Sequence, residues 1–310
     1  MTELHIKGLD LANALAFEKG VSEVLSANQK ATYLEQGFLS LEGVIPAQDI
    51  AEAHRVIDDF VERSRNVQSH NEVYDMEPGH SAIEPRVRRI KTPLSLHSIF
   101  SNIALSDRIL DAAEALLGNG VRLHGNKLNM KSAGFGSPIE WHQDFAFYPH
   151  SNDDLLAIGI ALDDSFLENG CTLMIPGSHR GLVLDHHQEG VFVGGVDMGK
   201  QQIDLSLAVP VPLKAGSISI HHCRTLHAAA PNRSAQRRRI LFIELAAVDA
   251  FPLRGVSDIA QFDSLILRGV PTRSYRSKAM DIRIPLPMPE SQGSIYEIQT
   301  QFRPRVFDEG

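Results

Sequence analysis

The sequence predicts a mainly β protein in which a small barrel or sandwich is flanked by helices. From residue 121 to about 248, short apolar runs alternate with glycine, proline and asparagine, as in strands joined by tight turns. Before residue 120, apolar residues instead recur at helical spacing. A chain of 310 residues with 43% hydrophobic content can bury a sizeable core, and we expect one domain over residues 1–310.

The N-terminal part, about residues 1–120, is expected to be largely helical. Its predicted elements are one or two short helices over 10–29, a strand over 37–45, and helices over 47–65 and 106–117. Residues 66–94 show little apolar periodicity and much His, Glu, Pro and Arg. We therefore predict a long functional loop there.

The predicted β core covers about residues 121–248. Its apolar runs are residues 121–130, 155–162, 171–175, 202–213, 217–221 and 239–248. A C-terminal extension, about 249–310, follows and carries one apolar patch over residues 259–267. This extension is expected either to cover the mouth of the barrel or to form a homodimer contact, and the pattern does not distinguish the two.

Charge and composition exclude several classes of partner. The net charge is −8 at pH 7, so no general basic field is present to hold nucleic acid or an anionic membrane. Only two cysteines occur, Cys171 and Cys223, which suits a reducing compartment and predicts two buried thiols. Without a secretory leader pattern or an apolar run of about 18 residues, a cytoplasmic protein with a small-molecule substrate is expected.

A histidine and a carboxylate two residues apart on a strand face the same side and can bind one metal ion. The pattern is weak alone, because about two such pairs are expected by chance among 14 histidines and 38 acidic residues. Three occur: His70-x-Glu72, His142-x-Asp144 and His187-x-Glu189. Only the second pair lies among aromatic residues, Trp141 to Tyr148, that can form the wall of a half-dry pocket.

Iron(II) oxygenases bind their metal with two histidines and one carboxylate, and the other coordination positions remain open. A third ligand is therefore expected on a later strand, and His221, His222 and His227 are the candidates.

Three further segments resemble the phytanoyl-CoA dioxygenase family. They are Asn169-Gly170-Cys171 with Ile175-Pro176-Gly177-Ser178-His179, then Leu226 to Ser234, and the strand ahead of a helix over Tyr33 to Val44. Together the matches span about residues 33–248. The resemblance implies a double-stranded β-helix (a cupin-like jelly roll), an Fe(II) cofactor, and 2-oxoglutarate and O₂ as cosubstrates.

The resemblance also implies the roles of individual residues. The family's metal ligands fall on His142, Asp144 and His227, and its 2-oxoglutarate-binding arginine falls on Arg238. A guanidinium binds a carboxylate through two parallel hydrogen bonds, which agrees with that role. Relatives also use a lysine where Lys131 stands, and a residue at the place of Gln143 can touch the cosubstrate.

The implied function is an Fe(II)- and 2-oxoglutarate-dependent dioxygenase that hydroxylates an aliphatic C–H bond of a small metabolite and releases succinate and CO₂. The alternatives are a cupin-like metalloenzyme without oxygen chemistry and a non-catalytic ligand-binding barrel. Arg238 argues against the first and the intact triad against the second. The sequence does not name the substrate, although the arginines of residues 86–89 can either bind an anionic substrate or face solvent.

Overall fold

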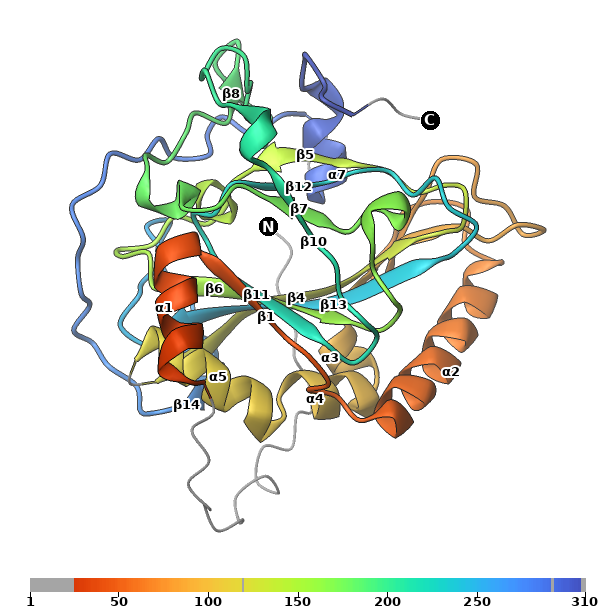
Figure 1. Cartoon of the computed structure of the whole chain (residues 1–310), viewed down its shortest axis with the longest axis horizontal. Helices are drawn as coiled ribbons and strands as arrows, with labels where there is room; N and C mark the ends of the chain where they lie inside the picture. Colours follow the sequence, from red (N-terminus) through yellow and green to blue (C-terminus); the bar gives the residue numbers. More distant parts are fainter. Residues whose placement is uncertain (1–24, 119, 291–292, 308–310) are drawn as a thin grey trace.

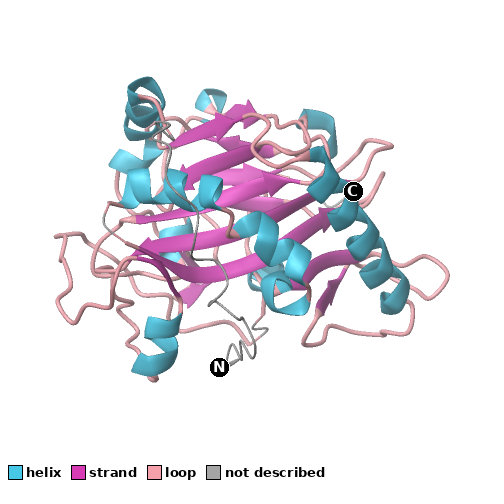
Figure 2. Cartoon of the chain, turned by 90° about the horizontal axis from the view of Figure 1, so that it is seen from below, coloured by secondary structure: helices cyan, strands magenta, loops and turns pink. Residues whose placement is uncertain are grey.

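Two antiparallel sheets face each other in the computed structural model, which describes residues 25–118, 120–290 and 293–307. Helices lie against the outer face of the larger sheet, as Figures 1 and 2 show. No helix in these described ranges is long and apolar enough to cross a bilayer.

The elements are bounded as follows. The larger sheet has the order β1 (Phe38–Leu41), β11 (Ile218–His222), β6 (Leu155–Ala161), β13 (Arg238–Ala247), β4 (Val121–Lys131), β3 (Val87–Lys91) and β2 (Tyr74–Met76), and β14 (Ile266–Arg268) also pairs with β4. The smaller sheet has the order β10 (Val209–Val211), β7 (Thr172–Met174), β12 (His227–Ala229) and β5 (Ile139–His142), and β8 (His187–Gln188) pairs with β9 (Val191–Phe192). The helices are α1 (Ala27–Gln36), α2 (Ala47–Ser64), α3 (Pro93–Leu96), α4 (Ser98–Ala104), α5 (Asp107–Leu117), α6 (Ile259–Ser264) and α7 (Ile295–Ile298).

Successive core strands alternate between the two sheets. The chain passes from β5 in the smaller sheet to β6 in the larger one and back to β7, and then from β10 through β11 and β12 to β13 in the same way. This alternation closes two sheets around a common interior and is the topology of a double-stranded β-helix. The mainly β fold with flanking helices and a jelly-roll core is therefore confirmed.

The period-two alternation of strand side chains separates the main hydrophobic core from the barrel interior. Ile158 on β6 lies opposite Ile220 on β11 and Ile243 on β13, and these isoleucines belong to the core cluster shared with the helices. Ala157, the neighbour of Ile158, lies opposite His221 and faces the other way, into the barrel. The core is thus outside the barrel, and small and polar residues remain for the interior.

Two of the predicted helices form as expected, and the third can be judged only in part. Helix α2 buries the apolar face read from the sequence, including Ile50, Ile57 and Phe60, and α5 ends before Gly118. Helix α1 begins after Ser26, whose side chain accepts a hydrogen bond from the Gln29 amide. The predicted helical segment over residues 10–24 lies outside the described residues.

The prediction of a long loop over residues 66–94 is wrong. Strands β2 and β3 and the start of α3 lie in this stretch, and β3 pairs with the long strand β4. Strand β3 was not predicted because three of its five residues, Arg88, Arg89 and Lys91, are charged, and its apolar residues are too few to show a period. The predicted strand over 202–213 is likewise confined to β10, after a 3₁₀ turn at Leu205–Leu207.

We predict that Ile243→Ala lowers the free energy of unfolding by about 2–5 kcal/mol, because it leaves a cavity between the larger sheet and the helices. Ile243 is fully buried, whereas the control residue Ile83 is 93% exposed. Urea denaturation followed by circular dichroism measures the difference. An equal, small effect of Ile243→Ala and Ile83→Ala would contradict this placement of the core.

Candidate metal centre

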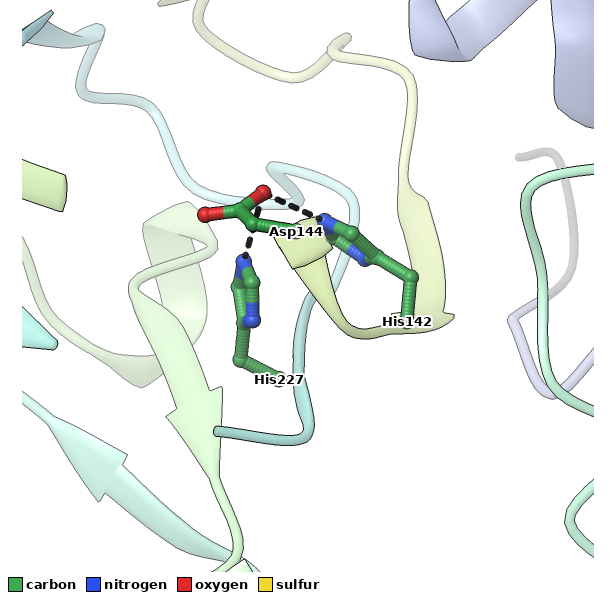
Figure 3. Close-up of side chains that lie close together, drawn as sticks. All are labelled: His142, Asp144 and His227. Atoms are coloured by element: carbon green, nitrogen blue, oxygen red, sulfur yellow. Dashed lines mark ion pairs between the residues drawn. The ribbon is translucent and has the colours of Figure 1, made fainter. Parts of the chain in front are cut away.

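Two strands of the smaller sheet bring His142, Asp144 and His227 together. His142 is the last residue of β5, and His227, the first residue of β12, is its cross-strand partner. Asp144 begins the 3₁₀ turn that follows β5. The three side chains converge in Figure 3, and one ligand atom from each lies within 4.8 Å of the others.

The donor atoms that converge are two imidazole nitrogens and one carboxylate oxygen. Asp144 Oδ1 lies 3.7 Å from Nε2 of His142 and 3.9 Å from Nε2 of His227. All three residues are buried. Two imidazoles and one carboxylate at one face of a site form the ligand set of non-haem Fe(II) oxygenases.

Backbone carbonyls fix the orientation of both imidazoles. His142 Nδ1 donates to the Glu140 carbonyl at 2.8 Å, and His227 Nδ1 donates to the Thr225 carbonyl at 2.9 Å. Because a carbonyl only accepts hydrogen bonds, each Nδ1 carries the proton and each Nε2 keeps its lone pair. Such bonds from the second ring nitrogen are typical of metal-binding histidines.

Burial and neighbouring charges set the protonation of the triad. Burial holds the pKa of His142 well below its usual value and lowers the pKa of His227 to about 4. Burial favours the neutral acid of Asp144, but His227 and His221 outweigh it and lower the pKa of that carboxyl well below its usual value. The histidines are therefore neutral and the aspartate is ionised at pH 7, as metal binding requires.

His221 holds the other oxygen of the aspartate. Its Nε2 lies 3.3 Å from Asp144 Oδ2, and its ring centroid lies 4.5 Å from that of His227. Of the two adjacent histidines considered from the sequence, His221 faces the barrel interior, and His222 lies near Asp153, with 3.9 Å from Nε2 to Oδ2. Because His221 holds Oδ2, the other oxygen of Asp144, Oδ1, points toward the Nε2 atoms of His142 and His227.

A small cavity of about 40 Å³ opens beside the triad. Arg238 lines it from the start of β13, and its Nη2 donates to the Gly170 carbonyl at 2.9 Å. Gly170 has φ +79°, and a Cβ there would lie 2.4 Å from the Ala230 oxygen, so this carbonyl position requires glycine. The cavity is lined by Lys127, Asn129, Ile139, His142, Asp144, Ala157, Thr172, His221, His227, Ala228, Ala229, Arg238, Phe242, Glu244 and Ile295.

The structure does not bring Lys131 and Gln143 into this cavity. Lys131 Nζ donates to the carbonyls of Ser137 at 2.8 Å and of Ala230, so its ammonium faces backbone oxygens. Gln143 donates to the Arg224 carbonyl and accepts from the Leu184 amide, away from the triad. Neither side chain lines the cavity that contains Arg238.

Lys127, Asn129 and Glu244 line the cavity and were not predicted as site residues from the sequence. The sequence did contain a signal for them, because residues an even number apart on a strand face the same side. Lys127 and Asn129 therefore share a face with Lys131, and Glu244 shares a face with Arg238. Arg237 and Arg239 have the opposite parity and pair with Asp58 outside this cavity.

The C-terminal extension covers part of the cavity. Ile295, in α7, is one of its lining residues, and α7 lies beside the smaller sheet in Figure 1. The Val306 and Phe307 amides donate to the Glu140 carboxylate, two residues before His142. Of the two expectations for this segment, covering the mouth of the barrel is the one that its contacts support.

The other predicted features take structural roles. The pairs His70-x-Glu72 and His187-x-Glu189 do not join a metal-binding group among the described residues. Cys171 and Cys223 are buried free thiols, as expected.

Comparisons with known proteins place the chain in a family. The chain matches the phytanoyl-CoA dioxygenase (PhyH) family over residues 33–240. It is 33% identical over 277 residues to a probable alpha-ketoglutarate-dependent hypophosphite dioxygenase of Stutzerimonas stutzeri. The match covers 88% of this chain and 96% of the relative. It is 26% identical over 246 residues to an ectoine dioxygenase of Bordetella bronchiseptica, covering 72% of this chain and 75% of the relative.

Solved structures share the fold. EctD from S. alaskensis with bound Fe superposes with a TM-score of 0.63 at 22% identity, covering 87% of this chain and 92% of that one. The non-heme alpha ketoglutarate dependent carbocyclase SnoK superposes with a TM-score of 0.60 at 23% identity, covering 82% and 97%. The family match and the relative that is 33% identical show that, as the sequence predicted, the chain belongs to the phytanoyl-CoA dioxygenase family of Fe(II)- and 2-oxoglutarate-dependent oxygenases.

Proposed function

We propose that this chain is an Fe(II)- and 2-oxoglutarate-dependent dioxygenase in which His142, Asp144 and His227 hold the iron and Arg238 binds 2-oxoglutarate. One observation carries the proposal: the two-histidine, one-carboxylate group and a buried arginine line the same small cavity. The enzyme class agrees with the family and with relatives named for dependence on alpha-ketoglutarate.

The donor set fits iron(II). Two neutral imidazole nitrogens and an ionised carboxylate would supply three ligands to iron(II), and the cavity beside them would admit cosubstrate and oxygen. Bound iron with 2-oxoglutarate and O₂ supplies the oxidising power, with succinate and CO₂ as coproducts. Within this site, His221 keeps Asp144 oriented, and the carbonyls of Glu140 and Thr225 keep both imidazoles in the ligating tautomer.

Arg238 fits the distal carboxylate of the cosubstrate. Its guanidinium is buried. Nη2 donates to the Gly170 carbonyl, and Nε has no hydrogen-bond partner among the described residues. A buried donor without a partner is costly, and a carboxylate that accepts from Nε and a terminal nitrogen would relieve that cost. Thr172 and Asn129 line the same cavity and offer further polar contacts to the cosubstrate.

The cavity suits a small substrate. Ile139, Phe242 and Ile295 form an apolar part of its wall. The relatives are named for hypophosphite, ectoine and L-proline, all small polar molecules. For this chain we propose hydroxylation of a C–H bond if the substrate is organic. If the substrate resembles hypophosphite, the bond that is hydroxylated is a P–H bond.

The first prediction concerns the metal. Anaerobic addition of Fe(II) and 2-oxoglutarate to the protein is expected to give a weak visible charge-transfer band, which His142→Ala and Asp144→Ala abolish because each removes a ligand. His70→Ala, in the half-exposed His70-x-Glu72 pair, serves as the control and keeps the band. Absence of the band from the unmutated, iron-loaded protein would sink the oxygenase proposal.

The second prediction concerns the cosubstrate. Arg238→Gln is expected to raise the Kd for 2-oxoglutarate at least about tenfold, because it removes charge-assisted hydrogen bonds to a carboxylate. Titration of the band, or calorimetry with the iron-loaded protein, measures this constant. Arg237→Gln is the matched control, since Arg237 is half-exposed and pairs with Asp58. Equal Kd values for the two variants would argue against a cosubstrate role for Arg238.

The third prediction concerns His221. His221→Ala is expected to weaken Fe(II) binding by about 10–100-fold, because Asp144 loses the partner that orients it. Competition with a coloured chelator measures the affinity. His222→Ala, the adjacent residue outside this cavity, is expected to leave Fe(II) affinity within about twofold of the unmutated protein, since it does not touch the triad. If both variants bind iron like the unmutated protein, His221 has no orienting role.

A further inference from the structure

Five charged side chains form a cluster on the barrel-facing side of β2, β3, β4 and β13, and two of them, Lys127 and Glu244, line the cavity beside the triad. They are Asp75, Arg89, Lys91, Lys127 and Glu244, named here the mouth cluster. Cross-strand register places them on one face: Asp75 lies opposite Arg89, Arg89 opposite Asn129, and Lys91 opposite Lys127. Because Asn129 and Lys127 line the cavity, the shared face is the one that looks into the barrel.

Ion pairs within the mouth cluster leave one positive charge in excess. Arg89 Nη2 and Lys91 Nζ both contact Asp75, at 2.6 and 2.9 Å. Lys127 Nζ lies 2.6 Å from Glu244 Oε1. Three cations thus share two carboxylates. Arg89 Nε is also buried without a hydrogen-bond partner among the described residues.

With Fe(II) and 2-oxoglutarate bound, the metal site and Arg238 together carry no net charge. This step rests on the proposed function. The two charges of Fe(II) and the one of Arg238 equal the three negative charges of Asp144 and 2-oxoglutarate. Within the cavity wall Lys127 and Glu244 balance as well. The one uncompensated cation therefore belongs to Arg89 and Lys91, which share the carboxylate of Asp75 beside the cavity, and its field favours a ligand of negative charge.

Lys127 is the one cation of the mouth cluster that lines the cavity. Its side chain is 27% exposed, and Glu244, which is 11% exposed, contacts it from β13. Glu244 is itself packed against the backbone at Gly125, where a Cβ would lie 2.2 Å from its Oε2. An ammonium has three N–H donors, so a fixed carboxylate on one side positions it and leaves donors for a ligand.

We propose that the substrate is a small molecule with one net negative charge on an oxyanion group, and that Lys127 binds this group at the mouth of the cavity. Both a phosphorus oxyanion and a carboxylate have the required chemistry. A cationic amine is disfavoured because the two carboxylates that line the cavity already have partners: Asp144 belongs to the metal site and Glu244 pairs with Lys127.

The test uses the full chain loaded anaerobically with Fe(II) and saturating 2-oxoglutarate. Calorimetry measures the Kd of four probes: methylphosphonate, acetate, neutral acetamide and ethylammonium. At least one of the two anions is expected to bind more tightly than acetamide and ethylammonium, and the better anion identifies the source of the oxyanion. If acetamide or ethylammonium binds as tightly as the better anion, or if neither anion binds, the proposal is overturned.

Variants of Lys127 and Glu244 test whether Lys127 binds the anion. Lys127→Met is expected to raise the Kd of the better anion at least about tenfold, and Lys127→Arg to keep it within about threefold of the unmutated protein. Glu244→Gln should bind the anion as tightly or more tightly, because a negative charge is removed. The double variant Lys127→Met/Glu244→Gln, which leaves no unpaired buried carboxylate, should lose binding as the single variant does. Unchanged anion binding in both Lys127→Met variants would overturn the assignment.

A control separates this proposal from the function on which it rests. The Kd of 2-oxoglutarate and the visible band are expected to stay unchanged in the charge-balanced double variant Lys127→Met/Glu244→Gln and in the surface variant Arg237→Met. If iron or 2-oxoglutarate fails to bind the unmutated protein, the proposed function is wrong. If both bind normally but no anion does, the function stands and only the substrate class is wrong.

Discussion

Side chains on the larger sheet alternate between an apolar outer face and a polar inner face, and this alternation makes the metal site possible. On one face Ile158, Ile220 and Ile243 pack with the helices and form the main core. Because that face supplies the apolar burial that stabilises the fold, the other face is free to carry small and polar residues. The barrel interior can therefore hold a metal-binding group, an arginine and an ion pair at once.

Polar groups buried in such an interior need partners, and the partners also decide the chemistry. The imidazoles of His142 and His227 are held by backbone carbonyls, and His221 holds one oxygen of Asp144. These bonds reduce the cost of burial and at the same time aim two nitrogens and one oxygen at a common point. Arg238 is held by the Gly170 carbonyl in the same manner, with part of its guanidinium left for a carboxylate.

Segments that are distant in the sequence complete the cavity. Strand β3, near residue 90, brings Arg89 beside the cavity wall, and α7, near residue 296, brings Ile295 into it. Both segments have weak sequence patterns, because a five-residue strand rich in Arg and Lys and a one-turn helix contain too few apolar residues to show a period. Their positions come from pairing with β4 and from the bonds of the C-terminal segment to Glu140.

The mainly β core, the long helices and the shared face of Arg238 and Glu244 could be predicted from the residues, because these features depend on local periodicity. The family resemblance added His142, Asp144 and His227. The different positions of Lys127, which lines the cavity, and Lys131, which donates to the carbonyls of Ser137 and Ala230, could not be predicted in this way. Both lysines have the same strand parity, and parity defines a face but not the position along the barrel axis, which depends on what other segments place opposite each residue.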